Sequence, residues 1–315
     1  MEKLRIVFMG TPEFAVGILD SILTNGYEVV GVITAPDKPA GRGQKIKFSA
    51  VKEYSLAQNL NLLQPTNLKD ENFIEELKSL NANLQVVVAF RMLPKVVWEM
   101  PEFGTFNLHA SLLPDYRGAA PINWAIINGD LKTGVTTFFI DDKIDTGALI
   151  LKKELDIYPS ENAGSLHDRL MVLGCTTVNE TLSLIENQKA KATLQNDADN
   201  FKTAPKLNKE NCKINWNASG PSIYNLIRGL SPYPTSWFML YDNETEMIVK
   251  VYNSKWIEEQ HDLKTGTLVT SKNELKVAVE KGFIEILELQ LPGKKKMTSK
   301  EILNGTKFSA EAYVS

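Results

Sequence analysis

Cysteine and histidine are scarce in this sequence. Of its 315 residues only two are cysteine, Cys175 and Cys212, and three are histidine. The two cysteines fall in different predicted segments and form no CxxC pair, which argues against a disulfide framework and against a zinc site of the usual ligand spacing. We therefore expect a protein of the reducing cytoplasm that needs no metal.

Long hydrophobic runs are also missing, and none approaches the length of a membrane span. The first apolar run, Leu4 to Met9, stops at Gly10-Thr11-Pro12. It is too short for the apolar region of a signal peptide with its cleavage site, so it predicts a buried strand. We expect no membrane partner.

Neither sign of charge is in excess, since 35 Lys and Arg residues face 38 Asp and Glu residues for a formal charge of −3. This balance argues against a chain that coats nucleic acid over its whole surface, so a polyanionic partner must be met by local patches. The first turn lacks the usual nucleotide-binding motifs, since Gly10-Thr11-Pro12 matches neither GxGxxG nor GKS/T. A tight turn from strand to helix is the plainer interpretation.

The length predicts two domains, and the first half of the chain alternates strands with helices. Strand, helix and strand follow one another within residues 4–34, which makes a βαβ unit and implies a parallel sheet. Buried strands are also predicted at 84–90 and 136–140, and helices at 51–59, 72–80 and 163–188. The fold class expected for residues 1–189 is an α/β, Rossmann-like parallel sheet.

The last third of the chain has a different texture. Residues 190–208 are polar and rich in lysine without an apolar period, which is typical of a linker. From 209 to 315 one helix at 222–230 is followed by five short strands, at 235–241, 246–255, 266–271, 274–279 and 282–291. That spacing predicts a small β-barrel as a second domain.

Asn107 and His109 stand two apart at a predicted strand end, so both side chains leave the same face of the sheet. An amide that donates and an imidazole that titrates near neutrality suit acyl transfer, where an oxyanion needs a donor and an attacking amine must lose a proton. Asp145, in an acidic turn after the strand at 136–140, is placed to reach His109 and fix its tautomer. For the pair alone the alternative is that Asn107 caps a turn and His109 is a satisfied, partly buried histidine.

Longer motifs surround the pair. The run NLHASLLPDYRGAAPI at 107–122, with IDTG at 144–147, resembles the formyltransferase family that uses 10-formyltetrahydrofolate. Further matches are GTPEFA at 10–15, PDKPAGRG at 36–43, VVVAF at 86–90, APKL at 204–207, IRGLSPYP at 227–234 and PGKKKM at 292–297. Together these matches span nearly the whole chain, and they imply that the second domain is OB-like.

The resemblance implies transfer of a formyl group from N10 of 10-formyltetrahydrofolate to the α-amine of methionine esterified to initiator tRNA. Asn107 would donate to the developing oxyanion, His109 would accept the amine proton or stabilise the same intermediate, and Asp145 would orient His109. No metal and no covalent intermediate are required. Two rivals stay open: transfer to an amino-sugar nucleotide or to glycinamide ribonucleotide, and a noncatalytic tRNA-binding or folate-binding module.

The folate is expected at loops that follow the strands. The predicted contacts are Phe90, Arg91, Met92, Leu93, Ser111, Leu112, Leu113, Pro114, Ile140 and Asp142. Many relatives carry glycine at the positions of Arg91 and Lys143, and a basic residue in place of Asp115, so this chain departs from the family there. We expect Arg91 to point to solvent, with the glutamate tail of the folate as the alternative.

Contacts to tRNA are expected from cations in three places. The resemblance assigns Arg42, in the long basic loop at 35–47, to the acceptor end. Lys206 and the cluster Lys294, Lys295 and Lys296 would meet phosphates, without stacked bases because no aromatic residue interleaves them. Phe14 would border the methionine side chain. The alternative for Arg42 is an ordinary solvated loop, for the lysines a solvated face, and for Phe14 packing in the helix core. We also expect the protein to be a monomer.

Overall fold

The computed structural model describes residues 3–40, 45–196 and 200–315. The chain divides into two compact units. The first runs to Gly118 and adds Gly134–Leu155 and His167–Thr203, and the second holds Ala119–Thr133, Asp156–Leu166 and Ala204–Ser315. Each unit therefore draws on separate lengths of the chain, and the domain limits at 1–189, 190–208 and 209–315 stay a prediction.

The first unit is built on one sheet with the strand order β10-β9-β7-β6-β1-β2-β5. Its pairs β5–β2, β2–β1, β1–β6 and β6–β7 are parallel, whereas β9 runs antiparallel to β7. The strands are β1 (Arg5–Gly10), β2 (Glu28–Ile33), β5 (Leu62–Leu63), β6 (Leu84–Val88), β7 (Thr105–His109), β9 (Lys132–Phe139) and β10 (Leu149–Asp156). The predicted parallel α/β fold is confirmed, and it carries an antiparallel strand that the sequence did not predict.

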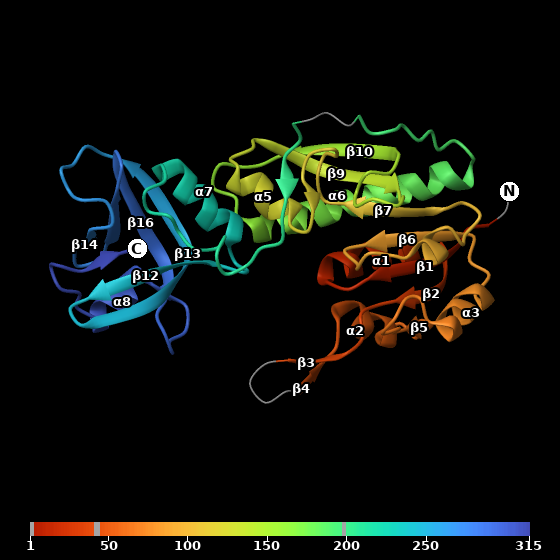
Figure 1. Cartoon of the computed structure of the whole chain (residues 1–315), viewed down its shortest axis with the longest axis horizontal. Coiled ribbons are helices and arrows are strands. Elements are labelled where there is room, and N and C mark those ends of the chain that lie inside the picture. Colours follow the sequence, from red (N-terminus) through yellow and green to blue (C-terminus); the bar gives the residue numbers. More distant parts are fainter. Residues whose placement is uncertain (1–2, 41–44, 197–199) are drawn as a thin grey trace. The chain divides into compact units, whose positions relative to one another are not determined.

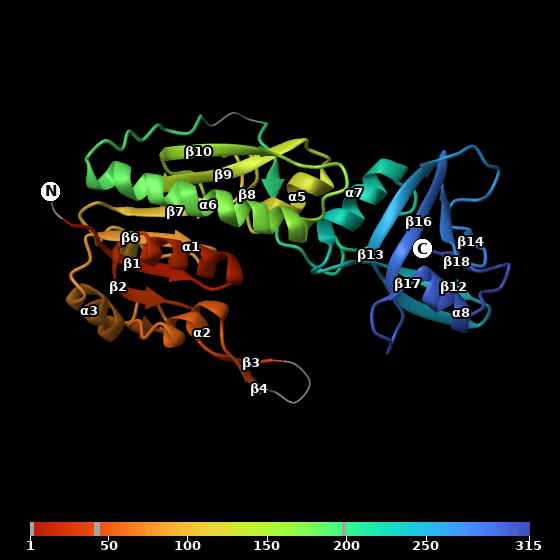
Figure 2. The same cartoon turned by 180° about the vertical axis from the view of Figure 1, so that it is seen from behind.

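Helices α1 (Glu13–Thr24) and α6 (Ala163–Glu186) lie together on one face of this sheet (Figures 1 and 2). They approach closely at glycines: a Cβ on Gly17 would meet the Met171 side chain at 2.5 Å. A Cβ on Gly174 would stand 2.9 Å from Leu108 of β7 and 3.1 Å from Ile18 of α1. Small residues thus let the two helices and the sheet pack without a gap.

The other helices of this unit are shorter. Helices α3 (Glu71–Ser79) and α4 (Lys95–Trp98) bury apolar side chains in a core cluster with Val7, Met9 and Val87 of the sheet. Helix α2 (Ala50–Ala57) starts at Ser49, whose hydroxyl accepts from the Lys52 N–H at 3.1 Å as an N-cap. Helices α3 and α4 therefore cover the face that carries Val7, Met9 and Val87, whereas α2 contacts α1 through the hydrogen bond from Tyr54 to Asp20 at 2.6 Å.

A short antiparallel hairpin, β3 (Lys38–Ala40) with β4 (Lys45–Lys47), stands where the sequence predicted only a basic loop. It is visible beside α2 in Figure 1. Arg42, the residue expected to contact the acceptor end, lies outside the described residues, so its role stays a prediction.

The second unit is a β-barrel with helices α5 (Pro121–Ile127), α7 (Gly220–Leu230) and α8 (Ser299–Gly305). Its sheet order is β14-β15-β16-β13-β12-β18, and β17 (Met297–Thr298) pairs with β16. The strands are β12 (Ser236–Asp242), β13 (Thr245–Glu258), β14 (Leu268–Thr270), β15 (Leu275–Val279), β16 (Gly282–Gln290) and β18 (Tyr313–Val314). Two further strands have two residues each: β8 (Arg117–Gly118) ends the first segment of the first unit, and β11 (Thr203–Ala204) spans the last division between the units.

The barrel is nearly closed because its two edge strands meet. The Leu268 N–H donates to Ala312 O at 3.1 Å, and the Val314 N–H donates to Gly266 O at 2.9 Å. Inside lies an apolar core of strand residues joined by Ile223 and Ile227 of α7. The predicted small β-barrel is confirmed.

Candidate active site

Strand β7 carries Asn107 and His109 on one face of the sheet. Leu108, between them, points toward Gly174 of α6, so the two polar side chains point to the opposite face. His109 is 7% exposed, and the neighbouring strand β6 is fully buried. The alternation read from the sequence therefore holds, and it puts an amide and an imidazole together in a largely apolar setting.

The His109 ring is held by a backbone carbonyl. Its Nε2 lies 2.8 Å from the Tyr116 O, and a carbonyl only accepts hydrogen bonds, so Nε2 carries a proton. Its Nδ1 lies 3.9 Å from the Asp145 Oδ2, which is longer than a hydrogen bond. The structure thus brings His109 and Asp145 together as predicted, but the Tyr116 carbonyl, rather than Asp145, fixes the tautomer.

Asp145 sits at the tip of a turn with a left-handed backbone conformation, φ 55°. Its Oδ2 accepts a hydrogen bond from the Gly118 N–H at 2.9 Å. Gly147, two residues on, has to be glycine because a Cβ there would stand 1.6 Å from the Phe139 O. Lys143, which departs from the family pattern, donates its N–H to the Asp141 Oδ1 at 3.0 Å within the same turn.

Asn107 has an unsatisfied side-chain oxygen. Its Oδ1 is buried and has no hydrogen-bond partner among the described residues. Leaving a buried polar atom unpaired costs about 1–3 kcal/mol, so such atoms call for an explanation such as a ligand. Because an amide oxygen only accepts hydrogen bonds, the unpaired Oδ1 suits an N–H of a bound ligand, such as an attacking amine, on the same face as His109.

The strand order alone does not explain why Asp145 lies near His109. Because β9 is antiparallel to β7, Ile140 at its end lies beside the start of β7, where its N–H donates to Thr105 O at 2.8 Å. The acidic turn therefore follows an antiparallel strand and begins beside the start of β7. The turn itself carries Asp145 back to within 3.9 Å of His109.

Several residues predicted for the folate meet in one region. Phe90, Leu93 and Ile140 all pack against the core cluster between the sheet and helices α3 and α4. The pKa of Lys95 is raised by its hydrogen bond to Glu99 first, then by the charge of Glu99 and by that of Asp142. Met92, with 69% of its surface exposed, and Asp142 lie at the surface.

The loop after β7 is held in shape by its neighbours. The Leu113 N–H donates to Thr136 Oγ1 at 3.2 Å, and Lys152 Nζ donates to the Leu113 O. Ser111 donates its hydroxyl to the Asp115 O at 2.7 Å, so Asp115 helps close the loop through its backbone. Leu112 and Pro114 are half-buried in the same loop.

Arg91 does not point to solvent, so that expectation is wrong. Its guanidinium donates to the Pro65 O and, at 3.1 Å, to the Thr66 O, and burial lowers its pKa. Backbone carbonyls of the loop after β5 offered the arginine hydrogen bonds that water would otherwise supply. It ties that loop to the one after β6.

Among the expected tRNA contacts, Lys206, Lys294, Lys295 and Lys296 are exposed. Lys296 forms an ion pair with Glu288 at 3.1 Å and lies 5.6 Å from the ring centre of Tyr252. Aromatic rings therefore do stand beside cations in this unit, which the sequence missed because Tyr252 is distant along the chain.

Phe14 is 6% exposed and meets the His167 ring edge to face at 5.3 Å. Its packing in α1 accounts for its burial, so a contact with the methionine side chain stays a prediction.

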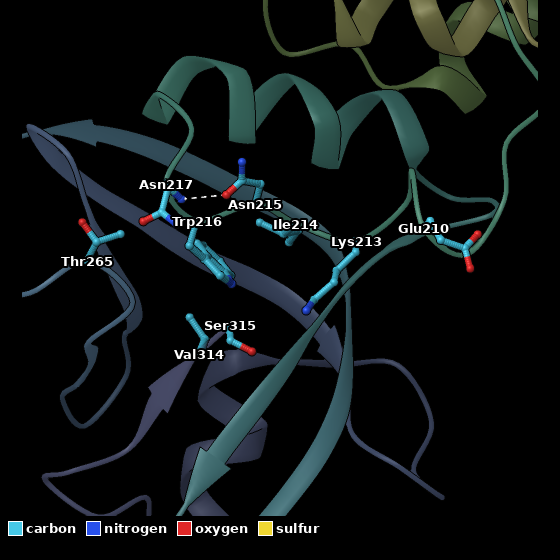
Figure 3. A pocket seen from close by; sticks show the side chains of 9 residues that line it. All are labelled: Glu210, Lys213, Ile214, Asn215, Trp216, Asn217, Thr265, Val314 and Ser315. Carbon is cyan, nitrogen blue, oxygen red and sulfur yellow. Dashed lines mark hydrogen bonds between the residues drawn. The ribbon is translucent and has the colours of Figure 1, made fainter.

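A pocket of about 480 Å³ lies within the second unit, as Figure 3 shows. It is lined by Glu210, Lys213, Ile214, Asn215, Trp216, Asn217, Thr265, Val314 and Ser315. None of these residues belongs to the predicted reaction site. No cluster of His, Cys, Asp or Glu able to hold a metal ion occurs in the described part of the chain, and none of its helices is long and apolar enough to cross a membrane.

Comparison with known proteins defines the class. The model described as "Formyl transferase" matches residues 4–182, and "Formyl transferase, C-terminal domain" matches residues 206–307. The chain belongs to the formyl transferase family.

Two relatives carry one name at high identity. The chain is 69% identical over 314 residues to "Methionyl-tRNA formyltransferase" of Flavobacterium johnsoniae, with full coverage of both chains. It is 54% identical over 313 residues to the protein of the same name from Bacteroides thetaiotaomicron, covering 98% of this chain and 97% of the relative.

Solved structures share the fold. WlaRD, a sugar 3N-formyl transferase crystallised with dTDP and 5-N-formyl-THF, has a TM-score of 0.66 at 23% identity, covering 94% of this chain and all of that one. HypX from Aquifex aeolicus in complex with tetrahydrofolic acid has a TM-score of 0.64 at 16% identity, covering 96% of this chain and 47% of that one. At these identities the likeness supports the fold alone.

Proposed function

We propose that this protein transfers the formyl group of 10-formyltetrahydrofolate to the α-amino group of methionine on charged initiator tRNA, for translation initiation. Full-length identity of 69% to a protein named methionyl-tRNA formyltransferase supports the substrate. The observation that carries the chemistry is the convergence of three side chains: His109 Nδ1 lies 3.9 Å from Asp145 Oδ2, and the Asn107 amide leaves the same face of β7 as His109.

The residues divide the work of acyl transfer. As the methionine amine attacks the formyl carbon, Asn107 donates its amide N–H to the oxygen that gains negative charge. His109 takes the proton that the amine loses, and Nδ1 is the acceptor because Nε2 already holds a proton against Tyr116. Asp145 stabilises the charged imidazole that results. The folate supplies the formyl group and departs as a secondary amine that gains a proton.

The folate is placed by the loops after β6, β7 and β9. Phe90, Leu93 and Ile140 give an apolar wall on the core cluster, and Asn107 offers an unpaired polar atom next to it, which fits a flat ring with polar edges. Arg91, Met92, Ser111, Leu112, Leu113, Pro114 and Asp142 complete the proposed contacts. Arg91 acts there by fixing the loop rather than by a free guanidinium.

The tRNA is proposed to meet exposed cations: Lys206, Lys294, Lys295, Lys296 and Arg42, with Phe14 next to the methionine. Phosphate contacts of this kind position a substrate without reading its sequence. We further propose that the protein acts as a monomer in the cytoplasm.

The direct test is incubation of the purified protein with radiolabelled formyl donor and a panel of acceptors. We expect label in methionyl initiator tRNA and none in free methionine, amino-sugar nucleotides or glycinamide ribonucleotide. Label in a sugar nucleotide instead would replace the proposed substrate while keeping the chemistry.

A second test separates catalysis from binding. His109→Ala is expected to abolish transfer in a rapid-quench assay while charged tRNA binds as before. His261→Ala is the matched control, because among the described residues that ring contacts only groups of the second unit: the Val279 and Gly282 carbonyls, and the Leu263 N–H and Phe283 ring. Normal turnover by His109→Ala would refute the assigned chemistry.

A further inference from the structure

The Gln195 amide uses all its hydrogen-bonding groups on the acidic turn and on one arginine. Its Nε2 donates to the Asp145 O and to the Gly147 O, both at 2.9 Å. Its Oε1 accepts from Arg117 Nη2 at 2.7 Å and from Arg117 Nε at 3.3 Å. The orientation of the amide is unambiguous because carbonyls only accept and guanidinium only donates.

Arg117 is in turn part of the short segment that holds both ionisable groups of the site. The residue before it, Tyr116, supplies the carbonyl for His109 Nε2, and the residue after it, Gly118, supplies the N–H for the Asp145 carboxylate. Gln195 therefore joins the two pieces of backbone that fix His109 and Asp145.

We call these hydrogen bonds of Gln195, which join the turn at 145–147 to Arg117, the Gln195 tie. Two further facts indicate why it is needed. Asp145 holds a left-handed backbone conformation, which costs an L-residue about 1–2 kcal/mol and must be maintained by its surroundings. The Arg117 guanidinium also lies 4.7 Å from the ring centre of Phe201, so the arginine is held from its other side as well. A loosened turn would let Asp145 move away from a histidine that it only just approaches at 3.9 Å.

We propose that Gln195 is a positioning residue of the formyl transfer reaction. It touches neither substrate, and it acts by locking the turn at 145–147 to the segment 116–118, so that Asp145 faces His109 Nδ1. This inference rests on the proposed function of the site, although the tie itself does not.

The activity test compares two substitutions at this position. Gln195→Ala removes the whole tie, and Gln195→Glu keeps an acceptor for Arg117 but turns a charged oxygen toward two carbonyls. Because a displacement of about 1 Å costs up to about 10² in rate, we expect kcat to fall about 10- to 100-fold in both variants, with KM for charged tRNA changed less than about threefold. Leu194→Ala is the matched control, since that neighbouring side chain is 82% exposed.

A double-mutant cycle with Arg117→Ala adds a readout that general destabilisation would not produce. If the two side chains act as one tie, the double variant loses hardly more kcat than either single variant. Additive losses, or a Gln195→Glu enzyme with wild-type kcat, would overturn the proposal.

Amide hydrogen exchange tests the tie without any substrate. We expect Gln195→Ala to speed exchange of the Gly118 N–H, which is bound to Asp145, while the strands of the sheet keep their protection. Faster exchange in a protein whose wild type transfers no formyl group would contradict the proposed function but not the tie. Unchanged exchange would contradict the tie, whatever the activity.

Discussion

Two asparagines of the first unit, Asn83 and Asn107, differ in their hydrogen-bond partners. We expect one to matter for stability and the other for activity. The Asn83 Oδ1 accepts from the Arg5 N–H at 2.8 Å, and its Nδ2 donates to the Lys3 O at 3.0 Å. The Oδ1 of Asn107 is buried with no partner among the described residues. The Asn83 amide therefore stabilises the start of β1, whereas the Asn107 oxygen is free to accept a hydrogen bond from a ligand.

Asn107→Ala is expected to lower kcat by about 10² to 10³, the usual loss for one oxyanion donor, with little change in the melting temperature. Steady-state kinetics and thermal unfolding measure the two quantities. Asn83→Ala is the control and should do the reverse, losing about 1–3 kcal/mol of unfolding free energy because two partly buried hydrogen bonds are lost, while kcat is kept. A large stability loss in the Asn107 variant alone would mean that it is a structural residue.

At the scale of elements, the turn between β9 and β10 decides where the carboxylate stands. Gly147→Ala would place a Cβ 1.6 Å from the Phe139 O, so the backbone has to shift. We expect kcat to fall by about 10² or more because Asp145 moves with the turn. Gly26→Ala serves for comparison: at φ +81° and with nothing within 4 Å, it should cost only about 1 kcal/mol of stability. A fully active Gly147→Ala enzyme would show that the turn does not position the reaction.

Helices α1 and α2 are joined by a tyrosine whose ionisation makes their contact pH-dependent. Burial, followed by the hydrogen bond to Asp20 at 2.6 Å and the charge of Asp20, raises the pKa of Tyr54 to about 12. A tyrosine in the unfolded chain titrates near pH ~10. Because the folded value is the higher one, this contribution to stability is complete below about pH 10 and is lost as the pH rises through about 12.

We therefore expect Tyr54→Phe to be less stable than wild type at pH 8, with the difference shrinking at high pH. Urea unfolding at a series of pH values measures it. Tyr233→Phe, at a side chain 83% exposed, controls for the substitution itself. No difference between Tyr54→Phe and wild type at pH 8 would mean that Tyr54 contributes by packing alone, because phenylalanine keeps the ring.

On the scale of the whole molecule, a chain with a formal charge of −3 has to bind a polyanion through local patches. Lys294 and Lys295 are exposed, whereas Lys296 already pairs with Glu288. Replacing Lys294 and Lys295 by alanine should flatten the slope of log affinity for tRNA against log salt by about one to two units. Lys264 and Lys272, exposed on either side of β14, form the charge-matched control pair, and an equal effect of both pairs would return the cluster to an ordinary solvated face.

The elements with a strong local period were predictable. Strands β1 and β6 and helices α3 and α6 lie within a few residues of the predicted ranges, and α1 and β2 fall within the predicted βαβ unit at 4–34, because their buried side chains recur at strand or helix spacing. The short helices α4 and α5 and the eight-residue strand β10 were missed. A helix such as α4, with four residues, has too few turns to show a period.

The site was only partly readable. Asn107 and His109 are neighbours on one strand, so alternation alone put them on the same face. The roles of Tyr116, Gly118 and Gln195 could not be read, because their contacts join backbone groups and residues up to 78 positions apart. Gln195 lies in a polar, lysine-rich segment whose composition predicted a linker.

The sequence by itself determined an α/β unit followed by a β-barrel, the family, and the amide, imidazole and carboxylate of the candidate site, because local periodicity and short motifs carry that information. Tertiary structure alone decided that β9 is antiparallel, that the Tyr116 carbonyl sets the histidine tautomer, and that a glutamine ties the acidic turn in place. These features depend on backbone hydrogen bonds and close approaches between distant segments, and such contacts leave no pattern in the order of side chains.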